Sequence, residues 1–143
     1  MSPLSLLATI LLAAICSTTL AQSITVNITD IRNSDGHIQI AIFKTAEQFD
    51  NDNPIKRLRF AKTGLKDGQL SVNIDLPAGT YAFGMLDDEN NDKEMDYNFI
   101  GMPQEGFGFS DYYHTGWSRP EFDDFDFELK GGQKTVTMKV RYI

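Results

Sequence analysis

The strongest constraint on the fold is a series of short segments in which apolar and polar residues alternate. In residues 23–31, Ile24, Val26 and Ile28 share one face of an extended chain, with Thr and Asn residues between them. The same alternation recurs in four later segments, which are residues 37–44, 70–76, 80–85 and 134–142. A period of two with many β-branched residues is typical of strands buried on one face. The pattern therefore predicts a β-rich domain with a single apolar core.

Turn-forming residues separate these segments and suggest how they connect. Asn33-Ser34-Asp35-Gly36 predicts a hairpin between the first two strands, and Pro77-Ala78-Gly79 predicts a second hairpin between residues 70–76 and 80–85. The rest of the chain indicates an edge strand in residues 55–62, a long ordered loop at 98–120 and a strand within 122–129. No segment has a convincing helical period. Six or seven short strands with one long loop predict an antiparallel sandwich or barrel.

Residues 1–21 differ from the rest because they contain no charged side chain and are rich in Leu, Ala and Ile. Small residues, Thr19 and Ala21, occupy the positions that a signal peptidase reads, so we expect a signal peptide at 1–21 and one domain at 22–143. A transmembrane anchor needs about 20 apolar residues, more than this run provides. A lipid-modified Cys16 is disfavoured because Ile15 precedes it. The prediction is a secreted or periplasmic protein without membrane insertion once the leader is removed.

Charge and cysteine content exclude several classes of partner and bond. The chain has 20 acidic and 13 basic residues and a net charge of -7, which disfavours nucleic acid as a partner. Its single cysteine, Cys16, would leave with the leader. A domain without disulfides depends on core packing or on a bound metal for stability.

An acidic segment after the fourth of these strands has the spacing of a calcium loop. Counted from Asp88, side-chain oxygens fall at positions 1, 3, 5 and 9, namely Asp88, Asn90, Asp92 and Asp96. Glu94 at position 7 would contribute its backbone carbonyl. Because no His or Cys lies nearby in sequence, zinc and copper are disfavoured. The segment predicts a Ca²⁺ site, and the alternative is a solvated acidic turn.

Two positions depart from the helix-loop-helix calcium pattern. Lys93 stands where that loop has Gly, and Phe99 stands where it has a bidentate Glu. Glu105 or Asp111, returning from the following loop, can supply the missing ligand.

The long loop also concentrates aromatic side chains, which are Phe107, Phe109, Tyr112, Tyr113 and Trp117. Aromatic residues beside a metal loop can stack on a sugar or anchor a protein partner. They can equally cover the open end of the sandwich as a small second core. The sequence leaves both interpretations open.

Evidence for catalysis is weak. His114 lies near Ser110, Asp111 and Ser118 in sequence, but no nucleophile-elbow motif is present. The acidic residues of 121–126 alternate with Phe and indicate the polar face of a strand, not a pair of catalytic carboxylates. We expect no enzyme activity, and a hydrolase remains the third alternative.

Three runs of residues resemble an exported bacterial family classed as a domain of unknown function. They are Leu76-Pro77-Ala78-Gly79-Thr80-Tyr81-Ala82-Phe83, the acidic run 87–92, and the run from Gly101-Met102-Pro103 to Phe109-Ser110. The resemblance covers essentially all of the chain after the leader. It implies a seven-stranded transthyretin-like, immunoglobulin-like sandwich, similar to adhesin B-type repeats and to the regulatory domains of some carboxypeptidases. Such adhesin repeats hold calcium in a loop of similar spacing.

The sequence therefore predicts an exported, non-catalytic sandwich stabilised by calcium, which acts as a binding or structural module. The alternative is a periplasmic accessory protein whose aromatic loop 107–117 takes a carbohydrate or small molecule. An unknown protein or a carbohydrate is the expected partner.

Overall fold

The computed structural model describes Ala14 and residues 20–143. Most of the predicted signal peptide, including Cys16, lies outside the described residues. Strand β1 begins at Gln22, the residue predicted to open the mature chain. No helix in the described part of the chain combines the length and the apolar character that crossing a membrane requires.

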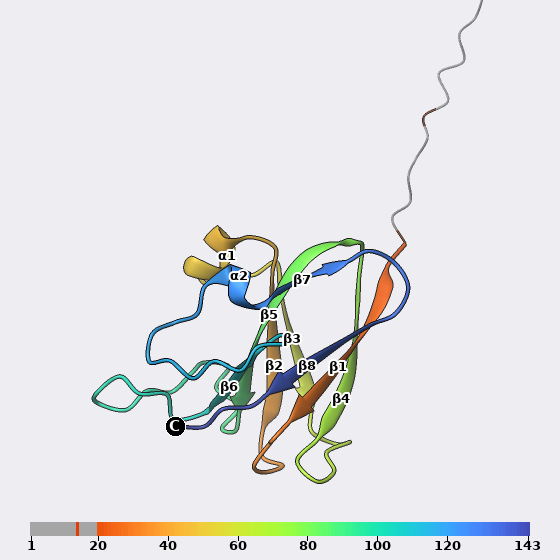
Figure 1. Ribbon diagram of the computed structural model, residues 1–143. Helices are drawn as coiled ribbons and strands as arrows, with labels where there is room; N and C mark the ends of the chain where they lie inside the picture. The colour runs from red at the N-terminus through yellow and green to blue at the C-terminus, as the bar shows by residue number, and fades with distance from the viewer. Residues whose placement is uncertain (1–13, 15–19) are drawn as a thin grey trace, which may run out of the picture.

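Two β-sheets pack face to face (Figure 1) and form a sandwich. The smaller sheet has the order β4-β1-β8, built from β4 (Leu70–Leu76), β1 (Gln22–Thr29) and β8 (Lys134–Lys139). The larger sheet has the order β3-β2-β5-β6, built from β3 (Lys56–Ala61), β2 (His37–Phe43), β5 (Gly79–Asp88) and β6 (Gly106–Phe109). Strand β7 (Asp126–Leu129) pairs with the first residues of β5. Strand β1 is antiparallel to β4 and parallel to β8.

The main core fills the space between the sheets and follows the predicted alternation. Ile24, Val26 and Ile28 of β1 are fully buried against side chains of the larger sheet. The same cluster includes Ile38, Ile40 and Ile42 of β2 and Phe83 of β5 from the larger sheet, and Val136 of the neighbouring strand β8. The prediction of an all-β protein with a sandwich core is confirmed.

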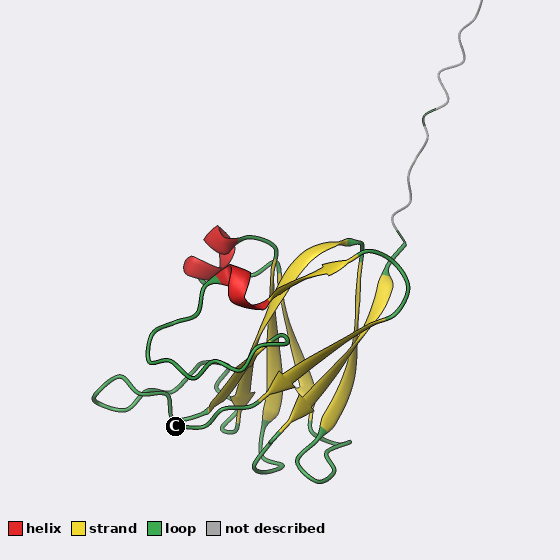
Figure 2. Cartoon of the chain, viewed as in Figure 1, coloured by secondary structure: helices red, strands yellow, loops and turns green. Residues whose placement is uncertain are grey.

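A second apolar layer covers the outer face of the larger sheet. Two short helices, α1 (Ala46–Asp50) and α2 (Phe122–Phe125), lie side by side over the sheet (Figure 2). The Phe49 ring of α1 packs edge-on against Phe43 of β2 at 5.3 Å and against Phe125 of α2 at 4.9 Å. Strand β2 is therefore buried on both faces, which explains its continuous run of buried residues from Ile38 to Phe43.

Both predicted hairpins are wrong, although their strands exist. Strand β1 pairs with β4 and β8, whereas β2 pairs with β3 and β5, so residues 30–36 carry the chain from one sheet to the other. Likewise β4 and β5 lie in different sheets although Pro77 and Ala78 alone separate them. The apolar faces of these consecutive strands meet across the core, because each buries one face against the opposite sheet. The alternation identified the buried faces but not the pairing partners.

The helices and one strand were also missed. Helix α1 begins at a Thr45-x-x-Gln48 sequence, in which the Thr45 hydroxyl accepts a hydrogen bond from the Gln48 N–H at 3.2 Å. Helix α2 replaces the first half of the strand predicted in 122–129, and Asp124 accepts a hydrogen bond from the N–H of Glu121 at 2.9 Å at its start. The described residues form eight strands instead of seven because β6 lies inside the predicted long loop. The predicted edge strand near 55–62 is confirmed as β3.

Candidate metal site and the adjoining cleft

Asp88, the last residue of β5, organises the acidic loop. Its side chain is fully buried, and its Oδ1 and Oδ2 accept hydrogen bonds from the N–H groups of Asp92 (3.1 Å) and Lys93 (3.0 Å). Asp92 in turn accepts a hydrogen bond from the N–H of Glu94 at 3.0 Å. These bonds coil residues 88–94 tightly around the Asp88 carboxylate.

The coil requires left-handed backbone at two positions that are not glycine. Asn91 has a φ of 61° and Lys93 a φ of 71°. Asn tolerates this region, but a long side chain is disfavoured there. Lys93 thus occupies a conformation that suits Gly, the residue expected at this position of a calcium loop.

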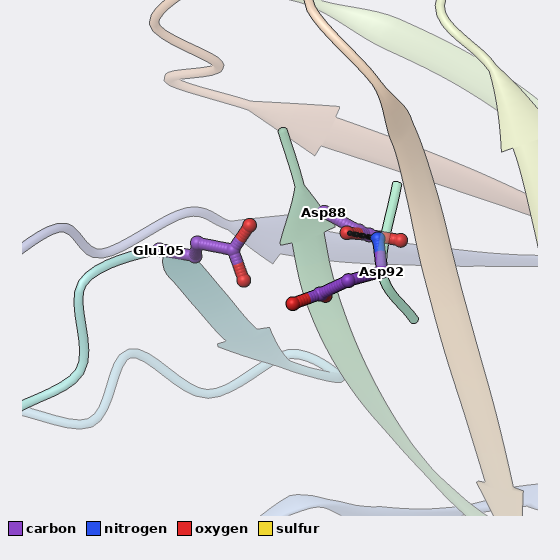
Figure 3. Close-up of side chains that lie close together, drawn as sticks. All are labelled: Asp88, Asp92 and Glu105. Carbon is purple, nitrogen blue, oxygen red and sulfur yellow. Dashed lines mark hydrogen bonds between the residues drawn. The ribbon is translucent and has the colours of Figure 1, made fainter. Parts of the chain in front are cut away.

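Three carboxylates converge at this loop (Figure 3). Oxygen atoms of Asp88, Asp92 and Glu105 all lie within 4.8 Å of one another. Glu105 immediately precedes β6 and is only 5% exposed. Its Oε1 accepts a hydrogen bond from the N–H of Glu89 at 3.1 Å, whereas Oε2 has no hydrogen-bond partner among the described residues. A buried carboxylate oxygen without a donor is unfavourable unless a cation or proton compensates it.

The pKa values of two of these groups shift in opposite directions. Burial raises the pKa of Glu105, the backbone N–H of Asp96 opposes this in part, and the nearby carboxylates of Asp96, Asp88 and Asp92 raise the pKa further. The backbone N–H of Glu94 lowers the pKa of the exposed Asp92, because it stabilises the ionised form. The cluster therefore combines a carboxylate that ionises readily with one that resists ionisation while no cation is bound.

The remaining predicted ligands lie around this cluster. The Asn90 amide nitrogen donates to Asp96 Oδ2 at 2.5 Å and to Asp92 Oδ2 at 3.3 Å, so this amide would have to rotate to present its oxygen to a cation. The side chain of Glu94 is exposed. Asp111 lies elsewhere, because its Oδ1 accepts a hydrogen bond from the N–H of Thr137 at 2.8 Å. Of the two candidates for the missing ligand, the structure brings Glu105 to the cluster.

Two side chains near the loop were missed in the sequence. Arg59 of β3 donates to Asp88 Oδ2 at 2.7 Å, and it also contacts the side chains of Gln39 and Asn91. His37 Nδ1 lies 2.6 Å from Asn91 Oδ1, so a histidine that is distant in sequence lies beside the loop. His37 comes from β2, which pairs with β5, and Arg59 comes from β3, which pairs with β2 on the other side, so only the strand pairing reveals them.

The other face of β5 carries a buried ion pair. Asp87 Oδ1 lies 2.5 Å from Lys62 Nζ, and both side chains are almost completely buried. The Tyr142 hydroxyl donates to Asp87 Oδ2 at 2.6 Å. Burial raises the pKa of Tyr142, and its hydrogen bond to Asp87 raises it further.

The aromatic residues of 107–117 divide into two groups. Phe109 packs against Phe125 at 4.9 Å and against Phe49 at 6.4 Å, and Tyr112 joins the same outer core. Phe107 is half-buried, whereas Tyr113 and Trp117 are 44% and 81% exposed. Both interpretations of this loop therefore describe part of it, since Phe109 and Tyr112 belong to a core while Tyr113 and Trp117 face outward.

A cleft of about 760 Å³ separates the acidic loop from the aromatic loop. One wall comes from the segment between Asp92 and Glu105, and the other comes from residues around Trp117. The lining of these two walls includes Lys93, Glu94, Met95, Tyr97, Met102, Pro103, His114, Trp117 and Arg119. The outer face of β2 and β5 closes the cleft behind them through Ala41, Phe43 and Gly84.

The residues considered for a triad do not form one. The Ser110 hydroxyl is buried and donates to the carbonyl of Phe125 at 2.6 Å, while it accepts a hydrogen bond from the N–H of Phe83. His114 Nε2 contacts the backbone carbonyl of Ser118. These side chains hold loops in place, and neither Ser110 nor Ser118 is arranged with His114 as nucleophile and base.

Comparison with known proteins identifies the family. Residues 26–137 match an uncharacterized protein family conserved in bacteria (DUF2141). The chain belongs to this family. The DUF2141 match spans all eight strands in whole or in part, together with the acidic and aromatic loops. No curated protein and no solved structure matches the chain.

Proposed function

We propose that the protein is an exported, non-catalytic module whose loop 88–105 binds Ca²⁺ and is braced by it. Asp88, Asp92 and Glu105 provide the anionic ligands. Asp96, a reoriented Asn90 and the Glu94 carbonyl complete the oxygen set expected from the spacing. Calcium takes six to eight oxygens in flexible geometry, which suits a loop of this composition better than the strict octahedron of Mg²⁺.

The environment of the Glu105 carboxylate is the observation that carries this proposal. Its buried Oε2 lacks a hydrogen-bond partner among the described residues and lies in a cluster with two other carboxylates. Arg59 compensates only Asp88 directly. A divalent cation between the three carboxylates would offset their mutual repulsion and would give Glu105 Oε2 a partner.

The predicted leader supports the choice of ion. Extracellular modules of the calcium-loop type bind at about 10⁻⁴ to 10⁻³ M Ca²⁺, concentrations found outside the cytoplasm. The resemblance to adhesin repeats and transthyretin-like sandwiches points the same way. A secreted or periplasmic location and a transthyretin-like ancestry are parts of this proposal.

Thermal unfolding with excess Ca²⁺ and with a chelator tests the proposal. Calcium at ten times its dissociation constant should stabilise the protein by about 1.4 kcal/mol. Asp92→Asn and Glu105→Gln should abolish this increment. Glu94→Gln is the matched control, because the exposed Glu94 carboxylate is not part of the cluster. A melting curve that does not respond to calcium, or an equal loss in the control variant, contradicts the proposal.

A ligand-binding accessory protein is the second candidate, and the cleft between the two loops favours it. The hydrolase alternative is not supported, because Ser110 is buried and engaged by backbone groups.

A further inference from the structure

The cleft has one exposed aromatic residue on each wall. Trp117 is 81% exposed and Tyr97 is 63% exposed, and both line the cleft. Neither ring contributes to a buried core cluster. Exposed aromatic rings that line a concave surface offer flat apolar platforms for a ligand. Phe107, which is half-buried, adds a further ring to the lining.

Charged groups of both signs accompany the rings. The lining carries Asp52 and Glu94 as acids and Arg57, Lys93 and Arg119 as bases. Several of these are already held in place, since Arg57 pairs with Asp52 at 3.1 Å and Arg119 donates to the carbonyl of Phe49 at 2.6 Å. A surface with both donors and acceptors and little net charge does not select an anion or a cation. It suits a neutral ligand with many hydroxyl groups.

A sugar ring can satisfy both the aromatic side chains and the polar groups of the lining. Its axial C–H groups form an apolar face that can pack on Trp or Tyr, and its equatorial hydroxyls both donate and accept hydrogen bonds. The volume of about 760 Å³ falls within the range of small-ligand pockets, about 300–1,000 Å³. The lining also contains apolar side chains such as Phe43, Met95 and Met102, so a fatty acid is the competing class of ligand.

We propose that this cleft binds a neutral oligosaccharide between Trp117 and Tyr97, and that cation binding in the loop strengthens the complex. The second statement rests on the proposed function. Residues 93–104 connect Asp92 to Glu105, and several of them form one wall of the cleft. A cation that fixes both ends of this segment fixes the wall and lowers the ordering cost of binding.

Trp117 is the only tryptophan, so its fluorescence reports on the cleft directly. The probes are chitotetraose, cellotetraose and maltotetraose, with dodecanoate as the competing ligand class. We expect a saturable spectral shift with at least one saccharide below about 10 mM, ten times a millimolar dissociation constant. A response to dodecanoate alone, or to none of the probes, overturns the proposal.

Two variants in the same turn provide a matched pair. Tyr97→Ala should weaken saccharide binding about tenfold, the change that 1.4 kcal/mol produces. Phe99→Ala should not, because Phe99 is 99% exposed and does not line the cleft. Calorimetry with Trp117→Ala should show a similar loss. Equal effects of Tyr97→Ala and Phe99→Ala would refute the assignment of the cleft.

Titrations in calcium and in chelator separate this inference from the proposed function. We expect saccharide affinity to rise about fivefold or more with calcium, and Asp92→Asn to remove that gain. Saccharide binding with the same affinity in calcium and in chelator refutes the coupling between the two sites but leaves the cleft assignment intact. Calcium binding without any saccharide response refutes the cleft assignment and leaves the metal site intact.

Discussion

Asp87 and Asp88 are consecutive residues of β5 whose carboxylates lie on opposite faces of the larger sheet. Asp87 faces the ion pair with Lys62, whereas Asp88 faces the acidic loop and Arg59. The alternation of a strand thus places one buried carboxylate in a structural pair and the next at the candidate metal site. The two sites share a backbone but have separate counter-charges, so their contributions can be measured separately.

Removal of Lys62 should destabilise the protein strongly. In Lys62→Met the Asp87 carboxylate stays buried without its cation, which typically costs about 3–5 kcal/mol. We expect a melting temperature lower by about 10 °C or more. The double variant Lys62→Met with Asp87→Leu should recover most of the loss, because it leaves no unpaired charge.

Lys130 provides the control for this measurement. It pairs with Glu128 at 3.2 Å on the surface, where both side chains are largely exposed. Lys130→Met should change the free energy of unfolding by less than about 1 kcal/mol. A Lys62→Met variant as stable as Lys130→Met would show that the buried pair does not support the fold.

Glu105→Gln should have effects of opposite sign in chelator and in calcium. Without a cation, the substitution removes a buried carboxylate that lies close to Asp88 and Asp92, so the chelated variant should be more stable than the wild type by about 1 kcal/mol. In excess calcium the order should reverse, since the variant lacks an anionic ligand. Urea unfolding of both proteins in both buffers measures the four free energies. The same order in both buffers would exclude Glu105 as a ligand.

Lys93→Gly should stabilise the loop. A φ of 71° is strained for Lys and allowed for Gly, and the relief should exceed the entropy cost of Gly by about 0.5–1 kcal/mol. Lys93→Ala is the control, because Ala retains the Cβ and therefore the strain. Calorimetric titration should also show tighter calcium binding for the Gly variant alone. Equal stabilisation by Ala would point to the lysine charge instead of the backbone.

The sequence predicts the local features of this protein better than it predicts which strands pair with each other. The alternation in β1, β4 and β8 correctly identifies buried faces such as Ile24, Val26 and Ile28, because burial of one face is a local property of a strand. The hairpin predictions fail because local turn residues do not determine which sheet the next strand joins. Here the consecutive strands lie in opposite sheets, where each buries its apolar face. Strand β6 was missed for a related reason. A Cβ at Gly106 would lie 2.5 Å from Tyr142 and Val140, so Gly is required there by a distant contact.

The candidate site shows the same division. Asp88 and Asp92 follow from spacing within one loop, and Glu105 was recognised only as one of two candidates in the next segment. Arg59 and His37 could not be assigned, because they reach the loop through the register of β3, β2 and β5. Spacing predicts ligands that one loop supplies, whereas counter-charges from other strands require the sheet topology.

Ionisation of Tyr142 should contribute to the loss of folding stability at alkaline pH. Burial and the hydrogen bond to Asp87 raise the pKa of Tyr142 above its usual 10.0, so the folded state favours the neutral phenol. The resulting stability is fully present below pH 10.0 and is lost as the pH rises toward the folded-state pKa. Tyr142→Phe should be less stable than the wild type at neutral pH, by about 1–2 kcal/mol, but should lose less stability between about pH 9 and pH 11. Denaturant unfolding at both pH values measures this difference, with Tyr113→Phe as the control on an exposed ring. Parallel losses in wild type and Tyr142→Phe would show that Tyr142 does not cause the loss of stability at alkaline pH.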